Sequence, residues 1–298
     1  MPTEEVEKGK LYIVATPIGN SRDISPRAVE ILENVDFVAA EDTRRTIILF
    51  NKLGIRNTLL SNHKFNEYKK AKYFIDDLLQ GKSVAIVTDA GTPCISDPGN
   101  ELIKEAIENG IDVMAVPGCC AAVAALSVSG FDLSTFTFIG FFPRENAEKK
   151  KALDRLAKST DVRTFVFYES PLRIMSTVEY FIDYGLDCRL CLCNDLTKKY
   201  EHAYRGTPAE VKEQLLDKGT YEKGEYVLVV EVSKETVKSK PVQPISAEAL
   251  LADVLVSQKC TLSDAIKTVL ADENNSYSKN ELKNAGIKLK DCFMELWG

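Results

Sequence analysis

The stretch IVTDAGTPCISDPG, residues 86–99, decides the fold of this chain, because it begins as a buried strand and ends as an unusual loop. Its first residues are apolar or β-branched, and the remainder holds two glycines, two prolines and two aspartates. Glycine lets the backbone approach a ligand closely, and proline fixes the path of the chain. A strand that runs directly into such a segment predicts a loop shaped for binding.

On both sides of this loop, expected strands alternate with expected helices. The strands are at residues 10–15, 36–40, 83–88 and 112–116, and the helices at 25–35, 66–81 and 98–110. In the first helix, Ala28, Ile31 and Leu32 share one face. Ser25 is its candidate N-cap, and Pro26 takes the first helical position. Such alternation predicts parallel strands with helices on both faces of the sheet.

The same pattern repeats in the second half of the chain. Strands are expected at 134–140, 163–169, 188–194 and 224–232, with helices at 147–158, 171–185 and 207–219. A polar segment with two prolines, 233–246, is typical of a linker, and three short helices follow at 247–258, 261–273 and 278–286. The predicted fold class is therefore α/β, with α/β domains at residues 1–120 and 121–235. A linker and a small helical domain are expected at 236–298.

Composition excludes several classes of protein. The chain has 298 residues, of which 45% are hydrophobic and 28% charged, as in soluble globular proteins. Its net charge of −6 argues against nonspecific coating of nucleic acid, and no apolar run reaches the length of a membrane span. Residues 1–10 are acidic and lack the apolar core of a signal peptide. We therefore expect a cytoplasmic protein with no membrane partner.

The cysteines predict free thiols rather than disulfides or a metal site. There are eight of them, in a long chain that is expected to be cytoplasmic. Cys188, Cys191 and Cys193 lie close together, but only two histidines exist and no second cysteine pair completes a set of four ligands. We expect these three residues to belong to a buried strand, and we predict no metal site.

Loops rich in glycine and proline leave the carboxyl ends of the expected strands, where open α/β sheets bind their ligands. No GxGxxG follows the first strand, which argues against a dinucleotide site. The segment DDLLQGKS, 76–83, lacks the upstream glycine of a phosphate-binding loop and lies between a helix and a strand. The sequence therefore predicts a cleft for a different ligand, lined by loops at 16–25, 40–46, 88–99, 117–122, 140–146, 168–173 and 194–201.

Five of these segments together resemble one family. They are ATPIGN at 15–20, AEDTRRT at 40–46, DAGTPCISDPG at 89–99, ESPLR at 169–173 and DLTKKYE at 195–201. In their order and spacing, over about residues 10–233, they resemble the tetrapyrrole methylase superfamily, the class III methyltransferases. Within this superfamily the resemblance is to members that methylate ribosomal RNA of the small subunit.

This resemblance implies a function and a cofactor. The implied reaction is methylation of the ribose 2′-hydroxyl of a cytidine in the decoding region of 16S ribosomal RNA, within the small ribosomal subunit. S-adenosyl-L-methionine would bind between two α/β domains, and a homodimer is implied, in line with the frequency of twofold oligomers. The implied cofactor-binding residues are Leu11, Pro17, Asp89, Ala90, Thr92, Pro93, Ile95, Cys120 and Ala121.

Methyl transfer to a hydroxyl needs an aligned oxygen and an acceptor for its proton. Glu41, Asp42 and Arg44 are candidates to orient the nucleotide and handle this proton. Alternatively, they form an ion-pair cluster in which Asp42 or Thr43 caps the next helix. Lys198 is a candidate to stabilise the alkoxide, or to act as base if burial lowers its pKa; the alternative is a solvated loop lysine.

Four residues are candidates for RNA contact. Arg173 is placed to clamp phosphate, with Glu169 to orient it, although the segment also predicts a helix beginning at Pro171. Lys149 and Lys150 belong to a basic helix that contacts phosphate or forms a solvated face. His63 contacts RNA or is an ordinary loop histidine. In addition, residues 261–286 have the outline of a helix-turn-helix for docking on a ribosome, or of a packing domain.

The chain departs from the family pattern at several positions. Cys119 and Cys120 stand where a Pro-Ser pair is usual, Asn194 and Asp195 where Arg-Glu is usual, and Leu172 in place of a histidine. Phe65 likewise replaces a histidine. These departures keep two alternatives open: a precorrin-type methyltransferase of the same fold, and a non-catalytic cofactor-binding factor for ribosome assembly.

Overall fold

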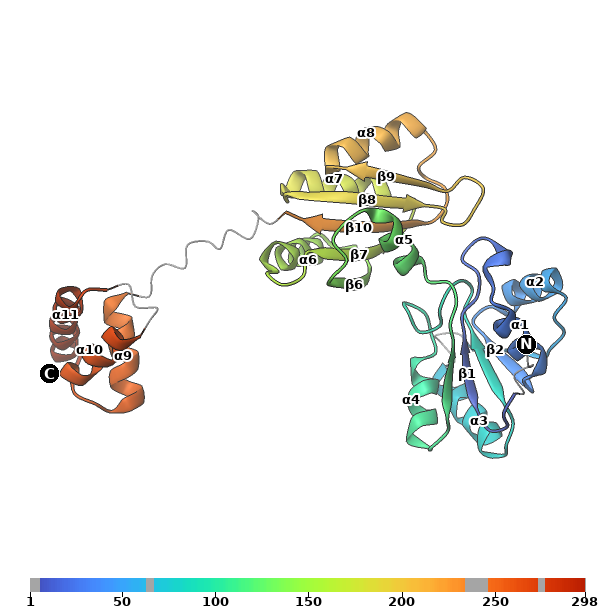
Figure 1. Cartoon of the computed structure of the whole chain (residues 1–298), viewed down its shortest axis with the longest axis horizontal. Helices are drawn as coiled ribbons and strands as arrows, with labels where there is room; N and C mark the ends of the chain where they lie inside the picture. Colours follow the sequence, from blue (N-terminus) through green and yellow to red (C-terminus); the bar gives the residue numbers. More distant parts are fainter. Residues whose placement is uncertain (1–5, 63–66, 234–245, 273–276, 298) are drawn as a thin grey trace. The chain divides into compact units, whose positions relative to one another are not determined.

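The computed structural model describes residues 6–62, 67–233, 246–272 and 277–297. The chain divides into two compact units, Met1–Val237 and Lys238–Gly298. The first unit contains two five-stranded sheets, and the second contains helices (Figure 1). The expected linker lies, apart from its end residues, outside the described residues. The three-domain division expected from the sequence stays a prediction.

The first sheet is parallel throughout, as predicted. Its strands pair in the order β3-β2-β4-β1-β5. They are β1 (Leu11–Val14), β2 (Phe37–Ala40), β3 (Leu59–Ser61), β4 (Val84–Val87) and β5 (Val113–Val116). Around them lie η1 (Ser21–Asp23), α1 (Pro26–Asn34), α2 (Thr43–Leu53), α3 (Glu67–Leu79) and α4 (Asn100–Glu108). The pattern missed β3 because it has only three residues, all half-buried.

The start of α1 confirms the predicted cap. The Ser25 hydroxyl accepts a hydrogen bond from the Ala28 amide at 3.1 Å, and Pro26 opens the helix. The buried face carries Ala28, Ile31 and Leu32, which pack with Val14 and similar strand residues. A separate cluster of buried side chains contacts α3 and α4. The parallel sheet thus has apolar contacts on both faces, and its loops are free to line a site.

The second sheet is mixed, so the expectation of parallel pairing throughout was wrong. Its order is β6-β7-β10-β8-β9, and only β6 and β7 pair in parallel. The strands are β6 (Phe136–Phe141), β7 (Thr164–Glu169), β8 (Cys188–Asn194), β9 (His202–Gly206) and β10 (Tyr226–Val232). The short connection from β8 to β9 permits only an antiparallel hairpin, and β10 inserts between β7 and β8. Strand β9 was missed, and it lies between the expected loop at 194–201 and the helix expected at 207–219.

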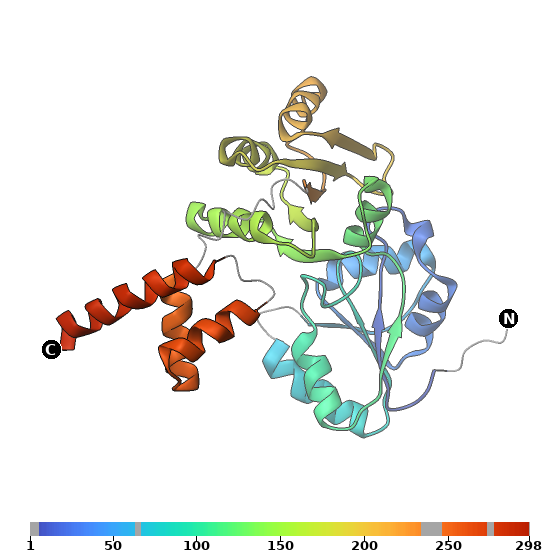
Figure 2. The ribbon, with the colours of Figure 1, turned by 60° about the vertical axis from the view of Figure 1, so that its left-hand side comes forward.

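Helices cover both faces of this second sheet (Figure 2). Three of them were predicted: α6 (Asn146–Lys158), α7 (Ile174–Tyr184) and α8 (Pro208–Lys218). The opposite face is covered by α5 (Ala121–Ser129), a helix of small apolar residues that the pattern missed. Cys191 and Cys193 on β8 are buried beneath it, and Cys188 is buried on the other face.

The second unit is a bundle of α9 (Ala247–Gln258), α10 (Leu262–Ala271) and α11 (Lys279–Trp297) around Leu251, Ile266 and Leu282. The third helix was expected to end at Gly286, but it continues to Trp297. Gly286 lies inside this helix, where a Cβ would come within 2.8 Å of the Leu262 side chain, so the glycine permits close packing of α11 against α10. Among the described residues, no helix has the length and apolarity needed to span a membrane.

Candidate active site

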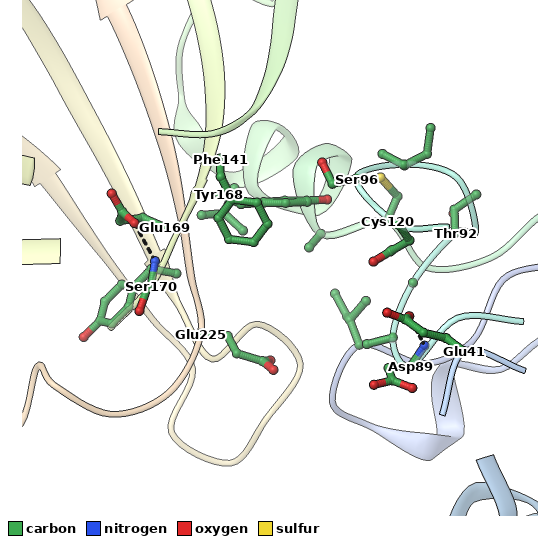
Figure 3. Close-up of a pocket in the computed structure, with 18 of the residues that line it drawn as sticks. Glu41, Asp89, Thr92, Ser96, Cys120, Phe141, Tyr168, Glu169, Ser170 and Glu225 are labelled. Atoms are coloured by element: carbon green, nitrogen blue, oxygen red, sulfur yellow. Dashed lines mark hydrogen bonds between the residues drawn. The ribbon is translucent and has the colours of Figure 1, made fainter. Parts of the chain in front are cut away.

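A pocket of about 410 Å³ lies where loops from both sheets of the first unit meet (Figure 3). The first sheet contributes the loops after β1, β2 and β4, and α5 contributes its first turn. The second sheet contributes the carboxyl ends of β6 and β7 and the start of β10. Because β10 runs antiparallel to β7, its first residue, Tyr226, pairs with Glu169 at the end of β7. The antiparallel insertion thereby brings Glu225 to the pocket.

The loop at 88–99 is held in an unusual conformation along this pocket. Gly91 and Thr16 exchange two backbone hydrogen bonds, of 2.9 and 3.0 Å, and the Thr92 hydroxyl donates to the Cys119 carbonyl at 3.0 Å. Cys94 and Ser96 have φ angles of 71° and 70°, a region that side chains other than glycine rarely adopt. Strain of this kind is concentrated at binding loops, where the surrounding contacts maintain it.

One side of the pocket is acidic. Glu41 accepts hydrogen bonds from the Thr88 hydroxyl at 2.6 Å and the Asp89 amide at 3.2 Å. Asp89 forms an ion pair with Arg45 at 3.2 Å, and burial raises the pKa of its carboxyl. Burial, together with the nearby charge of Glu41, raises the pKa of Asp97 to about 6. This side of the pocket therefore favours cationic groups.

The facing side is aromatic and apolar. The rings of Phe141 and Tyr168 meet edge to face, with centroids 5.8 Å apart and an interplanar angle of 71°. Burial raises the pKa of Tyr168 to about 12, so its hydroxyl stays protonated at neutral pH. Ile18, Ile95 and Val227 extend the apolar lining. Such a surface suits a flat ring system of a ligand.

The structure brings most of the predicted cofactor-binding residues to this pocket. Leu11 is instead fully buried in the core beneath the sheet, and Pro93 is also buried. Leu11, Pro93 and Pro17 do not line the pocket. Ile18, the neighbour of Pro17, lines it instead. The predicted residues in the lining are Asp89, Ala90, Thr92, Ile95, Cys120 and Ala121. Their contact with a cofactor stays a prediction.

Of the three catalytic candidates after β2, Glu41, Asp42 and Arg44, only the first lies in the pocket lining. Asp42 caps α2, accepting from the Arg44 amide at 2.9 Å. Hydrogen bonds from the Arg44 side chain and amide lower the Asp42 pKa to about 2. The structure thus gives Asp42 and Arg44 the capping and ion-pair roles of the alternative, and Arg45, which was not predicted, lines the pocket.

The contacts of Lys198 favour its cationic form over a neutral base, and its catalytic role stays a prediction. Burial alone would lower the pKa of its ammonium, but hydrogen bonds to Glu225 at 2.8 Å and Asp195 at 2.9 Å raise it overall. The cation is therefore kept, and it holds Glu225, a residue of the pocket lining. The same loop contacts the first sheet's loops, because the Thr197 hydroxyl accepts from the Asn20 amide at 3.0 Å.

Three of the four RNA-contact candidates lie in the described residues, and each has a partner within the protein. Arg173 binds Glu169 through two hydrogen bonds of 2.8 Å, and α7 begins after it at Ile174 rather than at Pro171. On α6, Lys149 lies over the Tyr180 ring at 5.2 Å, and Lys150 forms an exposed ion pair with Asp154. His63 lies outside the described residues.

Two positions that depart from the family pattern also have clear surroundings. Asn194 is fully buried, and its side-chain oxygen accepts a hydrogen bond from the Lys218 ammonium. Leu172 is exposed, at 79% of its surface. Within the part of the chain that the structure describes, no group of three or more histidines, cysteines or acids is arranged to hold a metal ion.

Several lining residues were missed from the sequence. Asp97 belongs to the stretch that predicts the binding loop, and an acid between serine and proline there was an available signal. Tyr168 directly precedes the ESPLR motif. Glu225 lies in the strand expected at 224–232, and only the antiparallel insertion of β10 brings it to this edge.

Comparison with known proteins decides the family. The sequence profile described as Tetrapyrrole (Corrin/Porphyrin) Methylases matches residues 10–235. The chain belongs to the tetrapyrrole methylase family. A protein of Haemophilus influenzae named ribosomal RNA small subunit methyltransferase I is 38% identical over 280 residues, covering 94% of this chain and 96% of that protein. One of the same name from Halalkalibacterium halodurans is 43% identical over 236 residues, covering 79% and 80%.

Solved structures of the tetrapyrrole methylase family share the fold. A cobalt precorrin-4 methyltransferase is 21% identical, with a TM-score of 0.54 over 74% of this chain and 94% of that one. A uroporphyrin-III C-methyltransferase from Thermus thermophilus, complexed with S-adenosyl homocysteine, is 15% identical, with a TM-score of 0.51 over 77% and 99%. The predicted fold class is confirmed, and so is the predicted class of enzyme, a methyltransferase.

Proposed function

We propose that this chain methylates ribosomal RNA of the small subunit, using S-adenosyl-L-methionine. The acceptor is the ribose 2′-hydroxyl of a cytidine in the decoding region of 16S ribosomal RNA. The identity to relatives named ribosomal RNA small subunit methyltransferase I, 38% over 94% of this chain, supports the substrate. The proposal includes action on the small ribosomal subunit in the cytoplasm, and the homodimer implied by the family resemblance.

The observation that carries this proposal is the composition of the pocket between the two sheets. Its volume of about 410 Å³ is in the range of small-molecule sites, about 300–1,000 Å³. The cofactor combines a flat adenine with a cationic sulfonium and an amino group, and the pocket combines an apolar side with an acidic one. Phe141 and Ile95 suit the ring, while Glu41 and Asp97 attract the cationic groups. The pocket therefore fits this cofactor.

When bound, the cofactor supplies an activated methyl group. The residues of the chain must then orient the hydroxyl and accept its proton. Asp97 is suited to accept a proton, because a pKa of about 6 leaves it ionised but more basic than an ordinary carboxylate at neutral pH. Glu41 and Asp89 are fixed by Thr88 and Arg45, which keeps them in position to attract cations.

The test is a methyl-transfer assay with radiolabelled cofactor. The substrates are small ribosomal subunits from cells that lack the modification, free 16S RNA and a precorrin. Alkali-resistant label at one cytidine is expected with the subunits. Label on the precorrin alone, or cofactor binding without any transfer, would refute the proposal and support one of the two alternatives.

Two variants connect the activity to the pocket. Asp97→Asn removes a carboxylate from the lining, and Asp183→Asn removes an exposed one from α7. The first is expected to lower transfer by about 100-fold or more, because acid–base groups typically contribute about 10²–10⁴-fold, and the second to leave it unchanged. Equal activity of both variants would exclude Asp97 from the reaction.

A further inference from the structure

A second groove lies on the outer edge of the second sheet. It has a volume of about 660 Å³ and is formed by the β8–β9 loop, strand β9 and helix α8. Strand β9 is the edge strand of the sheet (Figure 1). This groove is separate from the acidic pocket in its lining residues, and neither the family comparison nor the proposed reaction accounts for it.

Three of the eight residues that line the groove carry rings. Tyr200 comes from the loop and exposes 73% of its surface. His202 and Tyr204 follow two residues apart on β9, so they lie on the same face of the strand. Their rings meet edge to face, with centroids 4.5 Å apart. Tyr204 is buried and forms the floor, which leaves Tyr200 and His202 as the exposed rings.

Two lysines accompany these rings. The Lys199 ammonium lies 5.2 Å from the centroid of Tyr200, and the Lys218 ammonium lies 5.6 Å from that of Tyr204. Two acids, Glu201 and Asp217, also line the groove. The charges of the lysines and acids balance, in a chain whose net charge is −6. The groove is therefore suited to bases more than to a run of phosphates, since neutralising phosphates needs an excess of cations.

The groove is connected to the acidic pocket through the loop that carries Tyr200. Glu201 accepts a hydrogen bond from the Thr197 amide at 2.6 Å, which closes the loop on itself. Lys198, two residues before Tyr200, holds Glu225 in the pocket lining. One short loop therefore has residues in contact with the lining of both sites.

We propose that this groove binds an unpaired base of single-stranded RNA, stacked on Tyr200 beside the target nucleotide. The inference rests on the proposed function, since it assumes an RNA substrate. Unpaired bases in RNA loops are commonly recognised by stacking on aromatic side chains. The Lys199 ammonium lies over one face of the Tyr200 ring, so the base would stack on the other face and Lys199 would contact the phosphate of the same nucleotide.

Stacking and methylation are measured separately, so that either idea can fail alone. The probe is a short single-stranded RNA with one 2-aminopurine, whose fluorescence falls when it stacks. Wild-type protein is expected to quench the probe, and Tyr200→Ala to bind it about 5- to 150-fold more weakly, as expected for one lost base–aromatic stack. Tyr200→Phe keeps the ring and should behave as wild type. Tyr73→Ala, which removes an exposed tyrosine from α3, is the matched control.

Each outcome decides the proposal. If wild-type protein does not quench the probe, or if Tyr200→Ala quenches it equally, the groove does not bind a base. If polyphosphate, which has no bases, displaces the RNA and no quenching occurs, the contact is only electrostatic. If Tyr200→Phe fails together with Tyr200→Ala, the hydroxyl and not the ring is required. If wild-type protein methylates the RNA and Tyr200→Ala does so with an unchanged KM for RNA, the groove does not bind the substrate, and the proposed function still holds.

Discussion

Arg173 is expected to stabilise the fold rather than to clamp phosphate, and its replacement by alanine tests this. The Glu169 side chain is fully buried and accepts hydrogen bonds from the Ser170 amide at 2.7 Å and the Thr177 hydroxyl at 2.6 Å. Arg173 donates the other two hydrogen bonds that Glu169 accepts, and it also donates one to the Phe142 carbonyl. Arg173→Ala therefore leaves a buried carboxylate without its counter-charge.

Breaking a buried ion pair in this way costs about 3–5 kcal/mol. We expect a value near the lower end, about 3 kcal/mol, because the bonds from Ser170 and Thr177 remain. With a urea dependence of about 3 kcal/mol per molar, the midpoint of unfolding falls by about 1 M. Adding Glu169→Gln to the variant removes the unpaired charge, and should recover part of the loss.

Urea unfolding followed by far-UV circular dichroism measures this change. Arg44→Ala is the control. The Arg44 side chain is 88% exposed, so its ion pair with Asp42 contributes little to the free energy of unfolding. A wild-type midpoint for Arg173→Ala, combined with weaker RNA binding, would refute the structural role and restore the phosphate clamp.

Three further predictions follow from other contacts. The pKa of Asp97 is about 6 in the folded protein and near 3.8 in the unfolded chain, so the folded protein holds this proton more tightly. The free energy of unfolding that Asp97 contributes therefore falls as the pH rises towards about 6. The urea midpoint of Asp97→Asn, relative to wild type, should rise between about pH 4 and pH 6 and then stay constant; no pH dependence would contradict this. Gly19→Ala places a Cβ 2.7 Å from Lys198 Cγ and 2.9 Å from the Leu196 backbone carbonyl oxygen, so the loop must shift, and both methyl transfer and the urea midpoint should fall; wild-type values of both would show that the loop contact is dispensable. Ser25→Ala removes the cap of α1 and should cost about 1 kcal/mol in urea unfolding, whereas Ser25→Asp should retain most of the stability.

Local patterns were enough to place most of the helices and four of the five strands of the parallel sheet. Ser25 and Pro26 begin α1 as expected, because capping depends only on residues within one turn. The four longer strands of the first sheet were visible because each is an apolar run followed by a loop. The gathering of loops at the carboxyl ends of these strands also followed, since parallel strands all end at the same edge. Most of the lining from the first sheet was therefore predictable.

The sequence by itself determined that residues 86–99 form a strand and a binding loop, because glycine, proline and apolar runs act over a few residues. Only the tertiary structure decided the partners across the pocket. The insertion of β10 between β7 and β8 depends on pairing between segments more than 30 residues apart, and it brings Glu225 to the site. The pKa values of Asp97 and Lys198 likewise depend on burial and on distant charges. Such effects come from neighbours in space, which no local pattern of residues can specify.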